Sequence, residues 1–440
     1  MRVLRRGGGE ESELIGVLAR IMIRGNQETQ EIRMAAHASA RAVPTRYRDP
    51  LVKESARNAL FRKAYRLPPP REEHITRFRD TLFDGDPLAD EVVRMFAELP
   101  RGEGYRLLAR AVDQGIHSIP DAPAALVALF AELDARPEWV DDDKLELAAR
   151  TADRVGMSGE RVLSCICLTG GYRSSAANKP IAFTGALESM AYRRLAETSK
   201  FVFDLYESRT VARDSAGFRG AVMVRLMHAM VRVRLADDPR WQTEAWGLPV
   251  NQADLLATNL LFSSVFVIGL RALGHIVTRR EADALVHFWR YVGYLMGVRL
   301  DQLPHDFEEA CALVYLSAAT QPGGDEDSRK LAAALLAVPV DPDRPRPLVH
   351  IDTQWRAGFS RLVLGDEAGD ELGLPNNAWK WLVLGSTAWN FATEVVRLLL
   401  PGGNALFTRI RRARVRRNVE RALEGKPPTY RPYPPRSDPR

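Results

Sequence analysis

The sequence predicts an all-α protein, and three observations support this fold class. Apolar residues recur at helical spacing through most of the chain. No run alternates apolar and polar residues over a useful strand length, and no Asn-Gly turn joins two β-branched stretches. The chain has 440 residues, of which 46% are hydrophobic, so it is long and apolar enough to bury a large core. We therefore expect a large helical protein.

Six segments carry the helical period most clearly. They are, in chain order, Asp90–Pro100, Leu126–Val140, Glu188–Tyr206, Val224–Leu235, Leu255–Leu273 and Glu281–Val298. The fifth segment is nearly long enough to span a bilayer, but four polar residues interrupt it. A helix buried in the core of a soluble protein is therefore the better prediction for it.

Composition divides the chain into four regions. We expect an N-terminal helical region over residues 1–140, a globin-like core over 141–335 and further helices over 336–408 that pack on this core. Residues 409–440 hold eleven Lys and Arg against three acidic residues, a net charge of +8 in a chain whose total is +6. The end of this basic tail, residues 425–440, is too rich in proline and charge to build a core, which predicts an extended arm or disorder. Because the rest of the chain is close to neutral, no nucleic-acid partner is expected.

Cysteine usage and the N-terminus indicate the compartment. Cys165, Cys167 and Cys311 are an odd set without the spacing of a disulfide framework, which favours a reducing environment. Arg5 and Arg6 are followed by glycines and acidic residues rather than by an apolar segment, so no secretory signal is predicted. We therefore expect a cytoplasmic protein.

His228 is the first candidate for a functional residue. Apolar residues stand four positions before it and three and seven after it, so the imidazole lies on the apolar face of its helix. Both nitrogens of a buried imidazole need partners, and none is obvious nearby in the sequence. One interpretation is a core histidine bonded to a distant backbone carbonyl. The other is an axial ligand of a planar iron macrocycle.

Such a macrocycle would also need cations for its propionates and a polar group on the side opposite the imidazole. On the preceding predicted helix, Arg194 and Thr198 are four residues apart and share a face. The candidate propionate partners are Arg194, Arg225 and Arg232, since a guanidinium pairs bidentately with a carboxylate. For the last two, a solvated helix face is an equal alternative. Glu197 and Thr198 are the candidates for polar contacts on the distal side.

The pattern Arg-x-x-x-Thr, followed thirty residues later by His228, resembles the latex-clearing protein (rubber oxygenase) family, whose relatives include the oxygenase of mycophenolic-acid biosynthesis. Further stretches resemble this family in the same order along the chain: GDPLAD (Gly85–Asp90), ARPEWVD (Ala135–Asp141), KPIAFTGAL (Lys179–Leu187), WGLPVNQADLLAT (Trp246–Thr258) and FWRYVGYLMGV (Phe288–Val298). The resemblance implies an all-α fold with a globin-like core that holds haem b. It makes His228 the iron ligand and places Arg194 and Thr198 in the haem pocket. It also implies oxidative cleavage of a carbon–carbon double bond by dioxygen.

Two departures from the rubber-cleaving members bear on the substrate. Those members carry a lysine immediately before the threonine, where this chain has Glu197, and an acidic residue near the position of Asn178. An amide cannot abstract a proton at neutral pH, and a polymer such as rubber does not enter a cell. We therefore expect a haem b-dependent oxygenase that acts with dioxygen on an apolar small molecule, such as a terpenoid alkene, with Glu197 as the distal acid or base.

Two alternatives remain at the level of the sequence. One is a haem enzyme of another kind, a peroxygenase or an isomerase, that uses the same pocket. The other is a haem-based sensor or carrier without turnover that binds a partner through its basic tail. Apolar residues interleave the arginines of that tail at Ile410, Val415, Val419 and Leu423. This pattern indicates weak contact with an anionic membrane surface.

Overall fold

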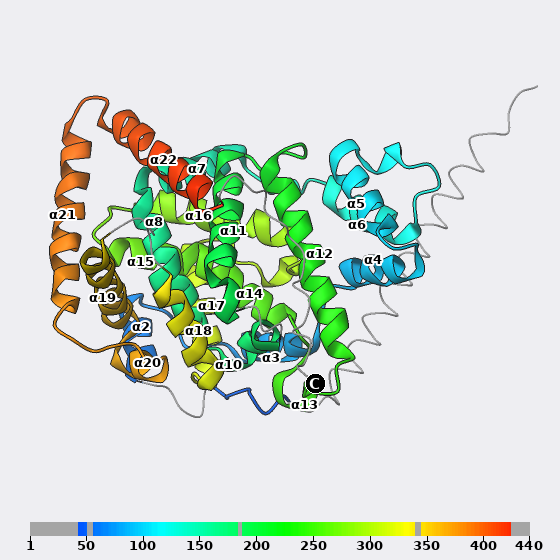
Figure 1. Ribbon diagram of the computed structural model, residues 1–440, viewed down its shortest axis with the longest axis horizontal. Helices are drawn as coiled ribbons and strands as arrows, with labels where there is room; N and C mark the ends of the chain where they lie inside the picture. Colours follow the sequence, from blue (N-terminus) through cyan, green and yellow to red (C-terminus); the bar gives the residue numbers. More distant parts are fainter. Residues whose placement is uncertain (1–42, 51–55, 184–186, 339–344, 424–440) are drawn as a thin grey trace, which may run out of the picture. The chain divides into compact units, whose positions relative to one another are not determined.

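The computed structural model describes residues 43–50, 56–183, 187–338 and 345–423. The chain divides into two compact units, Met1–Val43 and Pro44–Arg440. Only the last residue of the first unit is described, so the account below concerns the second unit. Every regular element in the described ranges is a helix (Figure 1), which confirms the all-α prediction.

The helices of the first half of the chain, including short 3-10 segments and one π-helical segment, are as follows: α2 (Ala56–Ala64), α3 (Glu72–Asp80), η1 (Thr81–Phe83), α4 (Pro87–Glu98), α5 (Glu103–Gln114), η2 (Ile116–Ser118), α6 (Ala124–Asp134), α7 (Asp142–Val155), α8 (Met157–Val162), the π-helix η3 (Leu163–Leu168), α9 (Thr169–Gly171), α10 (Ser175–Phe183) and α11 (Leu187–Glu207). Those of the second half are α12 (Ala216–Ala236), α13 (Thr243–Trp246), α14 (Gln252–Leu260), the π-helix η4 (Leu261–Val265), α15 (Phe266–Ala272), α16 (Arg279–Leu295), η5 (Leu300–Gln302), α17 (Phe307–Thr320), α18 (Glu326–Ala337), α19 (Arg346–Leu364), α20 (Asp366–Glu371), α21 (Lys380–Leu399) and α22 (Gly403–Ala422).

Helix α16 is the centre of the core. It begins with a capping box, in which the side chains of Thr278 and Glu281 each bind the other residue's backbone N–H. Its side chains are buried on nearly all sides, against α7, α12, α14 and α17. Within it, the indole of Trp289 donates a hydrogen bond of 2.8 Å to the hydroxyl of Tyr206 on α11. The helix therefore packs on α12 and contacts α11, the two helices that carry the candidate site residues.

The predicted apolar segment Leu255–Leu273 lies within α14, η4 and α15, which follow one another without a break. By length and composition, this run from Gln252 to Ala272 is the one helix in the described ranges that could cross a membrane, with a mean hydropathy of 1.7. However, 67% of the most apolar 18-residue stretch of this run is buried inside the protein. The segment lies in the core, as the sequence predicts.

One sequence expectation is wrong in detail. The helix predicted over Leu126–Val140 ends at Asp134, and Pro137, which lacks a backbone N–H and disfavours helix at the residue before it, follows three residues later. The arginine-rich first part of the predicted tail lies in α22, which packs on α7 and α11, and the extended arm predicted for residues 425–440 stays a prediction. Residues 424–440 lie outside the described ranges.

The face of α22 that was expected to meet a membrane is instead part of the protein interior. Val419 and Leu423 are buried against Ala196 of α11, and Val415 packs on the same small cluster. Ile410 alone among the four predicted contacts is exposed. Helices from different predicted regions also pack on one another. Helix α4 of the region 1–140 packs on α12 of the region 141–335, and α18, which ends at the boundary near residue 335, packs on α19 of the region 336–408. All four helices lie in one compact unit.

Candidate functional site

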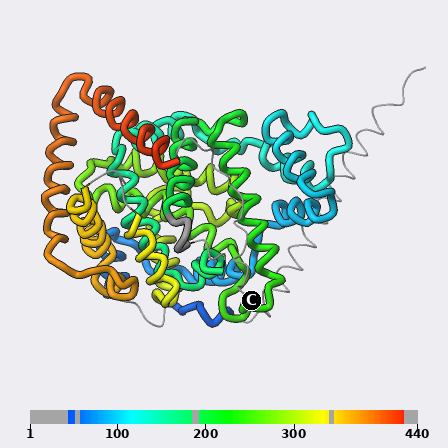
Figure 2. The backbone as a smooth tube through the Cα atoms, viewed as in Figure 1, coloured from blue at the N-terminus to red at the C-terminus, as the bar shows by residue number. Residues whose placement is uncertain are grey.

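Helices α11 and α12 form an antiparallel hairpin that carries the predicted site residues (Figures 1 and 2). Ser215 begins the second helix, since its hydroxyl accepts a hydrogen bond of 3.1 Å from the backbone N–H of Phe218. Twelve residues separate His228 from the start of α12, and counting the same number back from the end of α11 reaches Leu195. Because both helices rise equally per residue, His228 lies at the level of α11 between Arg194 and Thr198.

His228 has no hydrogen bond or ion pair in the described part of the protein, and its Nδ1 atom is buried. Burial in the protein, together with the nearby positive charge of Arg232, lowers the pKa of the imidazole to about 4. The ring is therefore neutral at pH 7, and no described residue forms a hydrogen bond with its nitrogens. A core histidine bonded to a distant carbonyl, the first interpretation of the sequence, is not what the structure shows.

Arg225, three residues before His228, is held by two carboxylates. Its Nε and Nη2 bind the two oxygens of Asp86 at 2.7 and 2.9 Å, and its Nη1 binds Glu132 at 2.8 Å. Burial disfavours the charge, but the two acidic partners more than offset this effect and raise the pKa of the guanidinium. Arg225 is almost completely buried, so it has neither a free fork for a propionate nor a solvated face.

Arg232, four residues after His228, is committed in the same way. Its Nε lies 2.9 Å from one oxygen of Asp90, its Nη2 lies 2.7 Å from the same oxygen, and its Nη1 donates to the carbonyl of Val250 at 2.9 Å. The prediction that Arg225 and Arg232 bind propionates stays untested, but the contacts of both arginines count against it. Each already pairs with a carboxylate of α4 or of the residue that caps it, and a propionate would have to compete with that partner.

Asp86 and Asp90 are the functional partners that reasoning from the sequence missed. Asp86 caps α4 by accepting a hydrogen bond of 3.3 Å from the N–H of Ala89, and Asp90 follows one turn later. The stretch GDPLAD thus presents two carboxylates to α12. One binds the arginine that precedes His228, and the other binds the arginine that follows it. Its signal in the sequence is the pair of aspartates four residues apart, which share one face of a helix.

Two further stretches meet at the Asp86–Arg225 pair. Gln252 is buried, and its amide donates hydrogen bonds of 2.8 Å to the carbonyls of Gly85 and Gly297. Gly297 has a φ of +79°, and a Cβ there would lie 2.1 Å from an oxygen of Asp86. Only glycine fits this position without displacing the ion pair. Three stretches that are far apart in the sequence therefore converge to fix α12.

The residues of α11 are less constrained. Arg194 is half-buried, and its guanidinium makes no hydrogen bond or ion pair within the described ranges; its electrostatic neighbour is the buried phenol of Tyr172. Thr198 donates its hydroxyl proton to the carbonyl of Arg194 at 2.9 Å, which leaves its oxygen free to accept. Glu197 accepts a hydrogen bond of 3.1 Å from Nε of Arg193. Of the three predicted cations, Arg194 alone keeps its donors uncommitted.

Asn178 has a structural role. It is buried, and its amide donates to the carbonyl of Tyr172 at 2.6 Å and to the hydroxyl of Ser328 at 3.3 Å. An aspartate could make neither of these donations. The amide found at this position therefore agrees with the surrounding contacts.

The donor set fits an iron that brings other ligands of its own. Among the residues described, no group of three or more His, Cys, Asp and Glu side chains is arranged to hold a bare metal ion. His228 offers a single neutral imidazole, the form that binds metals, with a buried nitrogen that has no partner in the part of the chain that the structure describes. One axial imidazole is what a haem iron takes from a protein of this kind.

The fold and site define an all-α protein in which a helical hairpin, fixed by buried ion pairs, presents an unsatisfied histidine. A family model described as "ER-bound oxygenase mpaB/B'/Rubber oxygenase, catalytic domain" matches residues 154–398. The match covers more than half of the chain, so the protein belongs to this family.

Two known proteins can be compared in more detail. The rubber oxygenase of Streptomyces sp. (strain K30) is 25% identical over 212 residues, which cover 47% of this chain and 50% of that protein. The similarity thus spans about half the length of this curated relative. The solved structure of latex clearing protein LCP in the closed state is 21% identical and has a TM-score of 0.60, covering 77% of this chain and 91% of the other. At this identity, the structural similarity shows a shared fold.

Proposed function

We propose that the protein is a haem b-dependent oxygenase that uses dioxygen to cleave or oxygenate a carbon–carbon double bond of an apolar substrate. The observation that carries the proposal is the imidazole of His228, which is neutral and has no partner among the described residues. Membership of an oxygenase family supports the type of reaction. When bound, the haem would supply activation of dioxygen, which the side chains of the protein cannot provide.

In this proposal the residues of the hairpin divide the remaining tasks. His228 would hold the iron, and the ion pairs of Arg225 and Arg232 would fix the helix that carries it. Arg194, with uncommitted donors, is the proposed partner of a propionate. The oxygen of Thr198 can accept a hydrogen bond on the distal side, because its proton already points to the helix backbone. Glu197 is the proposed acid or base.

The substrate class follows from the relatives and from two residues of this chain. The curated relative is named a rubber oxygenase, which favours an apolar, isoprenoid-like alkene. Glu197 stands where the rubber-cleaving members carry a lysine, and Asn178 stands where they carry an acid. We therefore propose a small or medium isoprenoid alkene as the substrate rather than the polymer.

Oxygen uptake tests the proposal. The haem-loaded protein should consume dioxygen when short isoprenoid alkenes are supplied and should release carbonyl products detectable by mass spectrometry. Glu197→Gln keeps the size of the side chain but removes its charge and basicity, so turnover should fall by about 10²-fold or more. Wild-type turnover by Glu197→Gln would refute the role of this residue, and Arg193→Gln, which keeps the carboxylate but removes its partner and a hydrogen bond to the carbonyl of Leu423, is the matched control.

The oxygen-uptake and product assays also distinguish the competing functions, a peroxygenase and a sensor or carrier. Turnover with hydrogen peroxide under strict anaerobiosis would favour a peroxygenase. Stable, reversible binding of dioxygen without any product from the alkene panel would favour a sensor or carrier. Either result would contradict the proposed dioxygen-dependent reaction while leaving the assignment of His228 intact.

A further inference from the structure

Helix α21 has its polar and apolar sides reversed relative to a surface helix of a soluble protein. Between Trp381 and Leu399 its charged residues are Glu394 and Arg397, and both are buried. Its other inward side chains are mostly polar as well. Its outer face, as we call it below, consists of exposed large apolar side chains: Trp381, Leu382, Leu384, Trp389, Phe391, Val396, Leu398 and Leu399. A surface helix of a soluble protein usually faces the core with its apolar side and the solvent with its polar side.

The inward contacts fix this orientation. The hydroxyl of Ser386 accepts a hydrogen bond of 3.0 Å from the indole of Trp355, and the amide of Asn390 donates to the carbonyl of Leu273 at 2.9 Å. Gly274 has a φ of +90°, and a Cβ there would lie 2.3 Å from the carbonyl oxygen of Thr387. The backbone of α21 therefore lies directly against the loop that precedes α16. Rotation of the helix would break these contacts.

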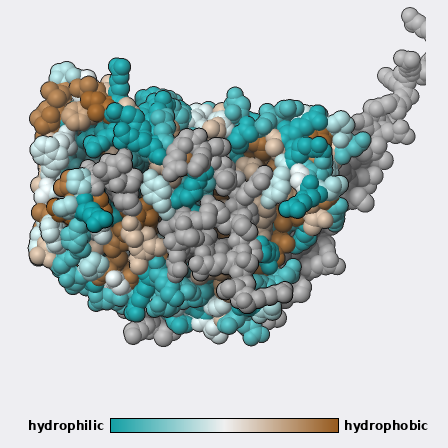
Figure 3. Space-filling view, in the orientation of Figure 1, coloured by the Kyte–Doolittle hydropathy of each residue, from teal (hydrophilic) through white to brown (hydrophobic). Residues whose placement is uncertain are grey.

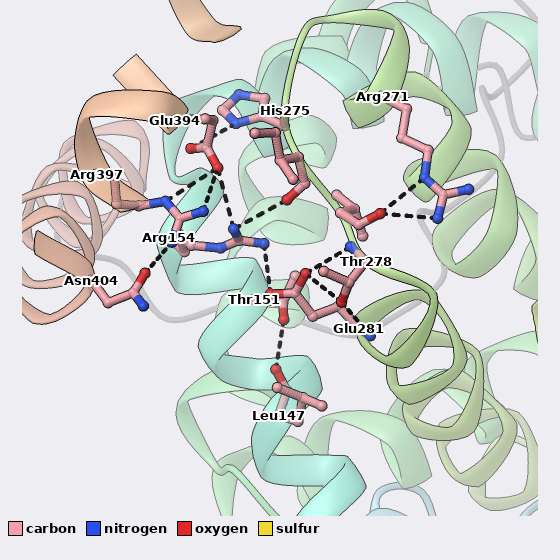
Figure 4. A network of polar contacts seen from close by, with 12 residues as sticks. Leu147, Thr151, Arg154, Arg271, His275, Thr278, Glu281, Glu394, Arg397 and Asn404 are labelled. Carbon is pink, nitrogen blue, oxygen red and sulfur yellow. Dashed lines mark hydrogen bonds and ion pairs between the residues drawn. The ribbon is translucent and has the colours of Figure 1, made fainter. Parts of the chain in front are cut away.

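Glu394 is the main anchor (Figure 4). Its carboxylate is completely buried, with one oxygen 3.2 Å from Nη1 of Arg154 and 3.0 Å from Nη2 of Arg397. The other oxygen binds Arg411 of α22 at 3.0 Å and lies 3.4 Å from Nδ1 of His275. These contacts tie α21 to α7, to the loop before α16 and to α22. Turning the helix over would withdraw this carboxylate from the buried guanidinium of Arg154, and removing one partner of a buried ion pair is costly.

The apolar exposure is concentrated on this part of the molecule. Of the eighteen large hydrophobic side chains that are exposed in the described ranges, eleven lie between Trp381 and Ile410. Trp389 is 71% exposed and Leu399 is 77% exposed. Figure 3 shows the hydrophobic surface at the upper left, around the end of α21 and the start of α22. Contiguous exposed apolar surface of this kind marks an interaction site.

The charge of the neighbouring helix indicates the partner. In α22, Arg411 pairs with Glu394, and both Arg412 and Arg416 pair with Glu207. The remaining arginines of this helix are exposed and form no ion pair within the described part of the chain: Arg409, Arg414, Arg417 and Arg421. Exposed aromatic and aliphatic side chains on α21, together with unpaired arginines on the helix that packs on it, match the interface of an anionic bilayer, where tryptophan and leucine enter the headgroup region and arginines meet lipid phosphates.

We propose that the outer face of α21, with the exposed arginines of α22, docks the protein on the surface of an anionic lipid bilayer. This surface differs from the membrane contact expected from the sequence. That expectation relied on Val415, Val419 and Leu423, which face the protein interior. It is also separate from the proposed haem site on α11 and α12, so its test does not depend on the enzymatic activity.

Sedimentation with vesicles tests the proposal on the full-length protein. The vesicles contain phosphatidylcholine alone or with phosphatidylglycerol in a ratio of about two to one. Trp389→Gln/Leu399→Gln removes two apolar side chains from the outer face without a change of charge. Its partition onto the anionic vesicles should fall by about tenfold or more, because the two large apolar side chains together contribute at least this factor when buried. Val127→Gln/Leu300→Gln removes two exposed apolar side chains elsewhere and should bind as the wild type does.

The arginines have a separate signature. Arg409→Gln/Arg414→Gln/Arg417→Gln should abolish the preference for anionic over neutral vesicles, and added salt should do the same to the wild type. Failure of the wild type to bind anionic vesicles, or equal binding by the outer-face variant and its control, would overturn the proposal. Light scattering distinguishes the competing occupant. If the wild type forms a dimer that Trp389→Gln/Leu399→Gln dissociates, while neither protein binds vesicles, the outer face meets a second copy of the chain and the lipid proposal is wrong.

Discussion

The ion pair between Asp86 and Arg225 gives a prediction that can be worked from the structure. Asp86→Asn keeps the shape of the side chain and its ability to cap α4 through the N–H of Ala89. It removes the negative charge and one of the two acceptors that bind Arg225 at 2.7 and 2.9 Å. Both residues are no more than 5% exposed. In the variant, the buried guanidinium of Arg225 therefore loses most of the negative charge that balances its own.

Removing one partner of a buried ion pair costs about 3–5 kcal/mol. Glu132 still binds Nη1 of Arg225, but from a more exposed position. We therefore expect the lower end, about 3 kcal/mol, which is roughly a 150-fold decrease in the ratio of folded to unfolded protein. The exposed pair of Asp113 and Arg219 is the control, since Asp113→Asn should cost less than about 1 kcal/mol.

Urea unfolding followed by far-ultraviolet circular dichroism measures these free energies. Arg225→Met should also be strongly destabilising, because it leaves Asp86 without its charged partner. The double variant Asp86→Asn/Arg225→Met leaves less uncompensated charge than either single variant implies, so its loss should be smaller than the sum by about 1–3 kcal/mol. A loss below about 0.5 kcal/mol for Asp86→Asn, or strictly additive effects, would refute the reasoning.

Two further stability predictions follow from other buried contacts. Gly297→Ala forces a positive φ on alanine and places a Cβ against Asp86, so the free energy of unfolding should fall by about 1–3 kcal/mol; wild-type stability would contradict the close approach of Gly297 to this carboxylate. In Glu394, burial opposes ionisation, but the hydrogen bond with His275 and the charges of the surrounding arginines lower the pKa from the ordinary 4.5 to about 2. Because the folded-state pKa lies below the unfolded value, this carboxylate stabilises the protein above about pH 4.5, and the effect is lost as the pH falls towards 2. Unfolding titrations across this window should show a shallower dependence on pH in Glu394→Gln, and an unchanged slope would count against the network.

The sequence predicts those features of the fold that interactions between neighbouring residues determine. Helical periodicity locates the segments of α4, α11, α12 and α16, because the period is a property of neighbouring residues. It also marks His228 as a polar residue on an apolar face. The ion pairs of Arg225 and Arg232 were not predicted, since their partners lie 139 and 142 residues away. No local pattern distinguishes an arginine that pairs with a carboxylate far away in the sequence from one whose donors are available to bind a ligand.

The same limit applies to the C-terminal helices. The stretch KWLVLGSTAWNFATEVVRLL contains apolar residues on all sides of a helix, so its sequence does not tell which side faces inward. Arg154, His275 and Arg411 decide this by binding Glu394, and they come from three separate parts of the chain. In α22, the sequence shows alternation of arginines with apolar residues, but only packing against Ala196 shows that Val419 is buried.

The absorption spectrum of the purified, haem-supplemented protein, with a pyridine haemochrome assay, tests the central claim most directly. The account predicts a Soret band and about one haem b per chain in the wild type. His228→Ala should lose or shift that band, whereas His287→Ala should keep it, because His287 is a buried histidine whose Nε2 already accepts the N–H of Asp141 at 3.0 Å. A wild-type protein that stays colourless with ample haem, or a spectrum unchanged in His228→Ala, would contradict the assignment of His228 as the iron ligand.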